Sequence, residues 1–424
     1  MMEDIINFGF QEVNSSIIKV IGVGGGGCNA VNHMLEEGIE GVDFIICNTD
    51  AQALQNSAVP IKIQLGVTLT EGRGAGNLPQ QGEQAAIENL DDIRIAIEGH
   101  TKMLFITAGF GGGTGTGAAP VIAELARELD ILTIAVVTIP SPAEGKKRFQ
   151  QAMDGVEKLK SHVDSMLVIS NEKLHKIYGD LPASHAFKKA DNILGTAVKG
   201  VAEIITLHGN INIDYADVHT VMAGSEVFIM GTGISEGDGR AMEAVHKALE
   251  SPLLDSNDIY GTKDILLNIT SGENEITMGE IGDIIEFLQE KAGQDANIIW
   301  GNGMDKRLGN HVSVTLIATR FNKNPNSLLQ EEEPAEEVVL EDQPCDINLE
   351  GEEEEDFAAI FEEEMRKQPQ QAEAKKRADN SRHKSKKKKR ELVSEESQES
   401  GSTDSWFQRQ FNRFFEDQDE TIDN

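Results

Sequence analysis

The sequence predicts an α/β protein with a doubly wound parallel-sheet domain, a long central helix, a second smaller α+β domain and a disordered C-terminal tail. Three observations indicate this architecture. Short apolar runs alternate with helical patterns up to about residue 180, as in parallel sheets covered by helices. One amphipathic pattern then continues over 181–207 with no proline after Pro182. Beyond residue 322 the chain becomes rich in charge and poor in apolar residues, which favours disorder.

The first domain is predicted to contain buried parallel strands, because its apolar runs are short, continuous and bounded by polar or glycine-rich segments. These runs are Ile17–Val23, Asp43–Cys47, Met103–Thr107, Ile131–Ile139 and Ser165–Ile169. Between them, helical spacing of apolar residues predicts helices at Asn29–Glu37, Gln80–Ile97 and Ala118–Leu129. Ligands bind beyond the carboxyl ends of the strands in such sheets, so we expect the functional site at that edge.

The segment Leu181–Leu207 is predicted to form one helix of roughly 40 Å, at about 1.5 Å per residue, ending at a cap formed by His208 and Gly209. The following domain has strand-like runs at Val227–Met230, Ile265–Thr270, Ala296–Trp300 and His311–Thr319, with helical patterns at Gly239–Leu249 and Met278–Lys291. We therefore divide the chain into an N-terminal extension (1–15), a nucleotide-binding domain (16–180), the central helix (181–208), the α+β domain (209–321), a charged linker (322–404) and an aromatic peptide (405–424).

The overall composition limits the classes of function and the location. A formal net charge of −34 argues against general affinity for nucleic acids or anionic membranes. Three cysteines, an odd and small number, fit a reduced cytoplasmic setting better than a disulfide scaffold. We expect no signal segment and no membrane span, because the start of the chain is acidic and no run approaches about 20 apolar residues.

Two glycine-rich loops are the strongest functional signal. The first reads Gly22-Val-Gly24-Gly25-Gly26-Gly27-Cys28-Asn29, and the second reads Gly109-Phe-Gly111-Gly112-Gly113-Thr114-Gly115-Thr116-Gly117. Each follows an apolar run and opens a helical pattern, where backbone N–H groups bind phosphate. Two such loops in one domain predict a bound polyphosphate. The first loop alone also matches a dinucleotide fingerprint, with Asp43 or Asp50 as the downstream acid, so a nicotinamide-dependent oxidoreductase is an alternative.

The second loop resembles the signature of the tubulin/FtsZ superfamily of GTPases, and the similarity extends over roughly residues 16–320. Further matching segments are Asn48–Leu54, Gly72–Gly76, Glu144–Arg148, Ala186-Phe187 with Ala190-Asp191, and Asn212–Val218. The resemblance implies a GTPase that polymerises head to tail into filaments of the bacterial division ring. It also implies GTP and GDP as ligands and a cytoplasmic location at midcell, on the inner face of the membrane. Mg²⁺ would be bound mainly by phosphates and waters, so we name no protein ligand for it.

The resemblance also assigns roles to individual residues. The glycine loops would bind the phosphates, the Gly72–Gly76 loop would sense the γ-phosphate, and Glu144 would accept from ribose hydroxyls. Asp191 would accept from guanine N1–H and the exocyclic amine, and Phe187 could stack on the base. The residues expected to bind nucleotide are Gly24, Gly25, Gly26, Gly27, Cys28, Asn29, Asp50, Ala51, Gly76, Gly109, Gly112, Gly113, Thr114, Gly115, Thr116, Glu144, Arg148, Asn171, Phe187 and Asp191.

Asn212, Asp214 and Asp217 follow the predicted central helix directly. An Asp-x-x-Asp sequence in this position most often caps a helix. If Asp191 is near the nucleotide, however, the helix rise puts this loop about 30 Å away, beyond reach of its own chain's site. The resemblance implies that the loop acts on the γ-phosphate of the next subunit in a filament. We therefore expect Asp214 and Asp217 to be catalytic, with Asn212 in support.

Two questions are left open by the sequence. A non-hydrolysing, tubulin-like structural protein remains an alternative to the GTPase. The tail ends in an aromatic cluster that contains Trp406, Phe407, Phe411, Phe414 and Phe415. It could form a helix that binds a membrane-tethering division protein, insert at a membrane surface with help from the basic Lys384–Arg390 block, or have no partner.

Overall fold

The computed structural model describes residues 16–206, 209–251 and 259–322. Its first half contains six parallel strands in the order β3-β2-β1-β4-β5-β6. Their bounds are β1 Ile18–Val23, β2 Val42–Asn48, β3 Ile61–Gln64, β4 Met103–Gly109, β5 Leu132–Ile139 and β6 Ser165–Ser170. The doubly wound parallel sheet is thus confirmed. Strand β3 was not predicted from the sequence, because this edge strand is short and its first two residues are exposed.

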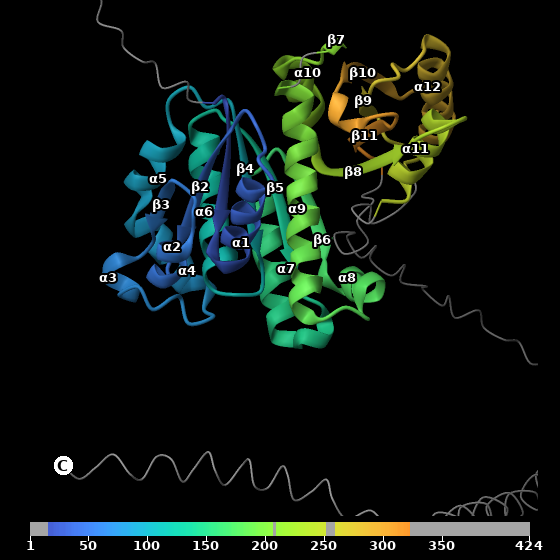
Figure 1. The fold of residues 1–424 in the computed structure, drawn as a ribbon. Coiled ribbons are helices and arrows are strands. Elements are labelled where there is room, and N and C mark those ends of the chain that lie inside the picture. The colour runs from blue at the N-terminus through green and yellow to red at the C-terminus, as the bar shows by residue number, and fades with distance from the viewer. Residues whose placement is uncertain (1–15, 207–208, 252–258, 323–424) are drawn as a thin grey trace, which may run out of the picture. The chain divides into compact units, whose positions relative to one another are not determined.

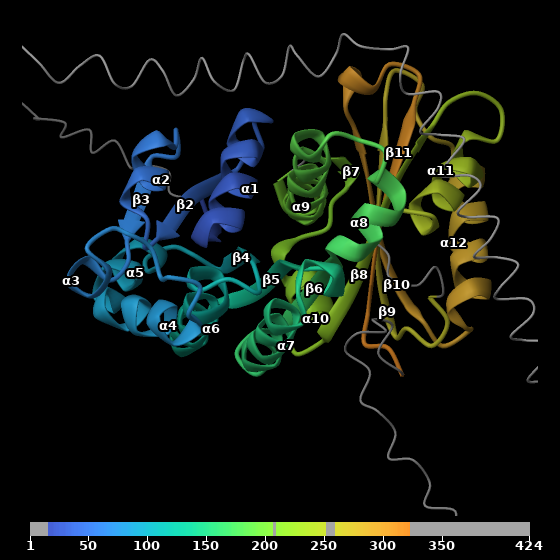
Figure 2. The same cartoon turned by 90° about the horizontal axis from the view of Figure 1, so that it is seen from below.

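Helices cover both faces of this sheet (Figures 1 and 2). Side chains of β1 alternate between two cores, with Ile18 and Val20 in the core under α1 and α9, and Ile21 and Val23 in the core under α6. The helices of this half are α1 Gly24–Glu36, α2 Ala51–Asn56, α3 Val67–Thr70, α4 Pro79–Glu88, α5 Leu90–Ile97, α6 Thr114–Glu128, α7 Lys146–Lys160 and α8 Asn171–Tyr178. Burial on both faces explains why the strands are continuously apolar.

The single helix predicted over Gln80–Ile97 is wrong, because the structure has two helices that meet at Asn89. The backbone of Asn89 leaves the helical region, with φ −111° and ψ 29°. Its side-chain oxygen accepts from Gly66 N at 2.8 Å, and its amide donates to Asp92 at 2.9 Å. Asparagine side chains compete for local polar groups in this way, which interrupts the helix although the apolar spacing continues.

The long central helix is confirmed as α9, Ala183–Thr206. Its 24 residues correspond to a length of about 36 Å. The expected cap residue His208 lies outside the described residues, whereas Gly209 begins strand β7. Helix α9 packs closely on the next part of the sheet at Gly200, where a Cβ atom would lie 2.0 Å from Met230 Cε and would require that side chain to move.

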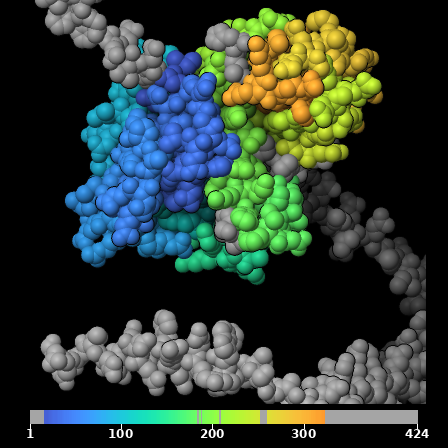
Figure 3. Space-filling model, viewed as in Figure 1, coloured from blue at the N-terminus to red at the C-terminus, as the bar shows by residue number. Residues whose placement is uncertain are grey.

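The later strands continue the same sheet in the order β8-β11-β9-β10-β7, as β8 pairs with β6 at Ser165–Glu226 and Met166–Val227. The remaining elements are β7 Gly209–Ile211, α10 Tyr215–Met222, β8 Glu226–Ser235, α11 Arg240–Leu249, β9 Asp264–Ser271, α12 Met278–Ala292, β10 Asn297–Met304 and β11 Val312–Thr319. In Figure 3 the orange part of the chain lies against its green part. One core contains residues of α9 together with Leu266 and Ile317, so both halves share it. No helix among the described residues has the length and apolarity to cross a bilayer.

Candidate functional site

Two neighbouring strands run directly into the two glycine loops. Strands β1 and β4 are parallel partners, with Val23 opposite Ala108, so their loops emerge side by side. Helices α1 and α6 begin in these loops without a side-chain cap and without an acidic residue in the first turn. Their first N–H groups therefore have no internal helical partner, and the positive ends of the two helix dipoles favour an anion here.

Several glycines in the loops are required by close backbone packing. A Cβ atom on Gly27 would lie 2.3 Å from Thr107 O, and one on Gly115 would lie 2.5 Å from Gly109 O. Gly24 has a φ of +71°, which side-chain-bearing residues rarely adopt. These glycines are explained by the fold itself.

Gly25 is different, because a Cβ atom there would meet nothing within 4 Å. Its side is open to a cavity of about 360 Å³ that lies between the two loops and α9. A Cβ atom on Gly112 would likewise meet only Asn77 Oδ1, at 3.9 Å. Since the protein does not need glycine at Gly25, this residue is best explained by a ligand that approaches the backbone closely.

The cavity brings together most of the predicted phosphate-binding residues and three residues from elsewhere in the chain. The predicted residues that line it are Gly25, Gly26, Asn29, Gly109, Gly112, Gly113, Thr114, Gly115, Arg148, Asn171 and Asp191. Residues missed by the sequence analysis also line it: Phe110, Thr138, Pro140, Ala190 and Leu194. Thr138 and Pro140 lie at the carboxyl end of β5, so the strand-end rule could have found them.

Asp191 is a partly buried acid that lines this cavity. Burial on α9 raises the pKa of its carboxyl to about 6, and the nearby charge of His33 opposes that rise. His33 belongs to α1, which packs beside α9 (Figures 1 and 2). A carboxylate that is partly desolvated and has few donors in the free protein is suited to accept hydrogen bonds from a ligand.

Glu144, Arg148 and Asn171 form a polar cluster at the edge of the cavity. The Glu144 carboxylate accepts from Ser141 N at 3.0 Å and from Asn171 Nδ2 at 3.1 Å, and lies 3.6 Å from the Arg148 guanidinium. Arg148 and Asn171 line the cavity, and Glu144 orients both of them. Glu144 lies just before α7, so its ion pair with Arg148 joins the preceding turn to the first turn of that helix.

The Gly72–Gly76 loop is held against the start of α2. Ala51 N donates to Gly72 O at 3.1 Å, and Gly74 N donates to Thr49 O at 3.2 Å. The Asp50 side chain caps α2 by accepting from Gln52 N and Ala53 N, at 2.9 and 3.2 Å. Asp50, Ala51 and Gly76 are not among the residues that line the cavity.

Three other residues that were predicted to bind nucleotide are not among the residues that line the cavity. The Cys28 thiol points into the core, 3.8 Å from Gly22 O and 3.7 Å from Cys47 O, and burial raises its pKa to about 12. Thr116 accepts from Gly111 N at 2.9 Å and so stabilises the loop from within. Phe187 is on α9, but its side chain lies outside the described residues.

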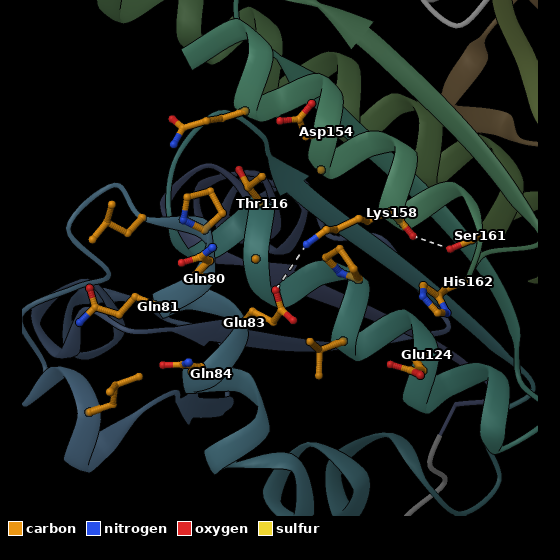
Figure 4. Close-up of a pocket in the computed structure, with 18 residues that line it drawn as sticks. Gln80, Gln81, Glu83, Gln84, Thr116, Glu124, Asp154, Lys158, Ser161 and His162 are labelled. Carbon is orange, nitrogen blue, oxygen red and sulfur yellow. Dashed lines mark hydrogen bonds and ion pairs between the residues drawn. The ribbon is translucent and has the colours of Figure 1, made fainter. Parts of the chain in front are cut away.

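A second, larger cavity of about 970 Å³ lies between α4, α6 and α7 (Figure 4). Thr116 lines this cavity, and the Glu83–Lys158 ion pair, at 3.6 Å, crosses it. It contains none of the other predicted site residues. If cavity volume alone were used to choose the functional site, it would therefore select this cavity and not the one between the glycine loops and α9.

The three predicted catalytic residues lie at the other end of α9 from the glycine loops (Figure 1). Asp214 is the N-cap of α10, and its side chain accepts from Asp217 N at 2.9 Å. In return the Asp217 side chain accepts from Asp214 N at 3.1 Å, which completes a capping box. The Asn212 side chain accepts from Gly209 N at 2.5 Å. None of the three lines the nucleotide cavity of the same chain.

Comparison with known proteins identifies the two parts of this architecture. Residues 17–179 match the GTPase domain of the Tubulin/FtsZ family, and residues 227–322 match the C-terminal domain of the FtsZ family. The chain belongs to the FtsZ family. It is therefore a GTPase of the cytoskeletal group that includes the cell division protein FtsZ, and its first domain binds GTP and GDP. The oxidoreductase and non-hydrolysing alternatives are wrong.

Relatives of the FtsZ family cover most of the described chain. The cell division protein FtsZ of Porphyromonas gingivalis is 46% identical over 324 residues, which are 76% of this chain and 71% of that protein. FtsZ of Azotobacter vinelandii is 49% identical over 306 residues, 72% of this chain and 77% of that protein. A solved FtsZ dimer from M. jannaschii is 44% identical with a TM-score of 0.67, covering 73% of this chain and 89% of that one.

Proposed function

We propose that this FtsZ-family GTPase assembles head to tail, and that each active site is completed by Asp214 and Asp217 of the next subunit. The observation that carries this proposal is the separation of the two parts of the site along α9. The glycine loops and Asp191 are near one end, and the acidic capping box is just beyond the other. A contact between unlike faces does not close on itself, so it builds a filament.

In the proposed complex the first turns of α1 and α6 donate N–H groups to the phosphates. Ionised Asp191 accepts from the two neighbouring donors of guanine, N1–H and the exocyclic amine, a pair that adenine lacks. Phe187 stacks on the base, while Glu144, Arg148 and Asn171 contact the sugar. The remaining residues of the predicted set complete the phosphate and loop contacts.

Hydrolysis requires a water held in line with the γ-phosphate, and carboxylates can orient and polarise that water. The capping bonds use Oδ1 of Asp214 and Oδ2 of Asp217. The second oxygen of each carboxylate can then accept from the water of the neighbouring subunit's site. The capping box thus fixes both side chains in one orientation before the subunits meet, with Asn212 bracing the loop.

Mg²⁺ fits this site as an ion carried by the phosphates. The described residues contain no group of three or more His, Cys, Asp or Glu side chains that could hold a metal. Mg²⁺ bound by phosphate oxygens and waters would neutralise negative charge on the phosphates.

The test measures GTP turnover per subunit against protein concentration, with light scattering recorded in the same sample. We expect both signals to begin at a shared threshold concentration. Asp214→Asn retains the helix cap, because asparagine caps as well as aspartate, but it loses the charge. This variant should bind GTP normally and turn it over at least tenfold more slowly. Turnover that is linear from the lowest concentration contradicts the proposal.

A mixing experiment tests whether Asp214 acts on the nucleotide of the neighbouring subunit or on that of its own chain. Asp214→Asn has an intact nucleotide site, whereas Asp191→Ala has an intact capping box but should not bind guanine. Each variant alone should be inactive, and an equimolar mixture should recover turnover. A mixture as inactive as its components would mean that the two groups act within one chain.

We further propose that the filaments form the scaffold of the division ring at midcell, on the inner face of the membrane. The aromatic segment 405–424 lies outside the described residues, and we propose that it binds membrane-tethering division proteins. Its removal should leave polymerisation unchanged and abolish the ring in cells. We expect no nucleic-acid partner, because the net charge is −34.

A further inference from the structure

Helix α10 determines where the catalytic carboxylates lie, because Asp214 and Asp217 occupy its first turn. It is only 8 residues long, or about 12 Å. Val218, Val221 and Met222 are buried and seat the helix in the core. If the C-terminal end of α10 shifted, the helix would tilt, and the carboxylates at its N-terminal end would move by a comparable distance.

The C-terminal end of α10 is unusually well held for so short a helix. Two of its last carbonyls accept from the following turn, His219 O from Ala223 N at 2.9 Å and Met222 O from Ser225 N at 3.3 Å. The other two accept from side chains at the end of β11. Val221 O accepts from the buried Thr319 hydroxyl at 3.1 Å, and Thr220 O accepts from Arg320 at 2.9 Å. All four carbonyls that such a helix end leaves without helical partners are thus satisfied.

Arg320 makes two contacts at this end and a third with Asp264 of β9. Its Nη2 donates to Thr220 O and to Ala223 O, at 2.9 and 3.2 Å, and its Nη1 donates to Asp264 Oδ2 at 3.0 Å. Asp264 is oriented in turn by Asn297, whose amide donates to the other carboxylate oxygen at 3.2 Å. The positive charge also complements the negative end of the α10 dipole.

The backbone of Arg320 is the second observation that singles it out. Its φ is +53°, a left-handed conformation that favours glycine and that other residues adopt only at a cost. An arginine at this position must be held there by its side-chain contacts. The conformation directs the guanidinium back across the end of α10, roughly 100 positions earlier in the sequence.

The other end of α10 has its own attachment. The Tyr215 hydroxyl donates to Lys102 O at 2.9 Å, immediately before β4. Helix α10 is therefore tied to the GTPase half at its first residue and to the last strand of the later half at its end. Its orientation depends on both attachments.

We propose that Arg320 is a positioning residue for GTP hydrolysis: by holding the C-terminal end of α10, it sets where Asp214 and Asp217 enter the site of the next subunit. This inference rests on the proposed function. Arg320 does not touch the nucleotide of its own chain, so its effect is on turnover and not on GTP binding. A displacement of about 1 Å at a reacting centre can lower the rate by a factor of about 100.

The test compares Arg320→Gly, Arg320→Lys and the control Arg94→Ala. Glycine removes the guanidinium and accepts the positive φ, so it should not strain the backbone. Arg94 matches Arg320 in exposure, with 36% against 38% of the side chain exposed, and it also pairs with a carboxylate, yet it does not touch α10. We measure GTP affinity below the assembly threshold, and turnover per subunit at saturating GTP well above it.

We expect Arg320→Gly to bind GTP as the wild type does, with turnover about 10- to 100-fold lower. Arg320→Lys keeps the positive charge but lacks the planar guanidinium that donates to three acceptors. Its turnover should therefore lie between that of the wild type and that of Arg320→Gly. Arg94→Ala should match the wild type. Unchanged turnover in Arg320→Gly overturns the inference. If Arg320→Gly loses GTP binding or fails to fold, the test rests on Arg320→Lys. Wild-type turnover and wild-type GTP affinity in Arg320→Lys would then overturn the inference.

Mixing assigns the defect to the correct end of the subunit. An equimolar mixture of Arg320→Gly with Asp191→Ala should recover turnover, because the second variant supplies an intact α10 to the first variant's nucleotide. A mixture with Asp214→Asn should not recover. If Asp214→Asn lowers turnover and Arg320→Gly does not, the inference fails while the proposed function stands. Full turnover in Asp214→Asn overturns both.

Discussion

Binding of guanine nucleotides by this chain should weaken as the pH falls from 7 to 5, through protonation of Asp191. In the proposed complex the carboxylate accepts two donors of guanine, which requires that it be ionised. An exposed aspartate has a pKa of about 3.9 and would remain more than about 90% ionised at pH 5. Burial on α9 instead raises the pKa of Asp191 to about 6 in the free protein, so its protonation falls inside this range.

The magnitude follows from the ionised fraction of the free protein. With a pKa of about 6, roughly nine-tenths of Asp191 is ionised at pH 7, half at pH 6 and one-tenth at pH 5. If only the ionised form binds, the affinity for GDP should fall about twofold by pH 6 and about tenfold by pH 5. The direction of the pH effect follows from the two forms of Asp191. Ligand binding favours its ionised form, whereas burial in the free protein favours its protonated form.

The assay is calorimetric titration with GDP, at protein concentrations where light scattering detects no polymer and circular dichroism shows a folded chain. Asp191→Asn should bind more weakly at every pH and lose this pH dependence. Glu203→Gln is the matched control: Glu203 is on the same helix and burial also raises its pKa, but it lies toward the opposite end. An affinity that is constant from pH 7 to 5, or an equal fall in Asp191→Asn, would refute the reasoning.

Four further predictions concern single substitutions. Gly25→Ala should fold normally but bind GDP at least tenfold more weakly by calorimetry, since its Cβ would meet no protein atom within 4 Å and would point into the space proposed for the ligand. Gly27→Ala should lower the thermal unfolding temperature, since its Cβ would lie 2.3 Å from a backbone oxygen. Tyr215→Phe should lower the free energy of unfolding in urea by about 1 kcal/mol through loss of the hydrogen bond to Lys102 O. Cys28→Ala should leave GDP affinity within about twofold, because the thiol faces the core, and a larger loss would show that it contacts the phosphates.

The glycine loops that we propose to bind phosphate could be recognised in the sequence, because their proposed contacts are made by backbone groups. Glycines such as Gly25 and Gly112 carry that information in their own identity and in their place after an apolar strand. The role expected of Asp191 came from the family resemblance, and helical periodicity only placed the residue on the long helix. These signals are local, since each depends on residues within a few positions of one another.

The break at Asn89, the inward direction of the Cys28 thiol and the position of Thr116 were not readable in this way. Each depends on a partner from another element, such as Gly66 N for Asn89. Apolar spacing is the same in a continuous helix and in two helices that meet at one residue, so only the partner distinguishes them.

The sequence by itself therefore determined the two glycine-rich loops, the parallel strands and the long helix, because glycine patterns and hydrophobic periodicity act over short distances along the chain. Only the tertiary structure decided how acidic Asp191 is, which oxygens of Asp214 and Asp217 are committed to capping, and what holds α10 in place. Those properties depend on burial and on contacts such as Arg320 with Thr220, which join residues 100 positions apart. No local pattern records such contacts, because folding alone brings their partners together.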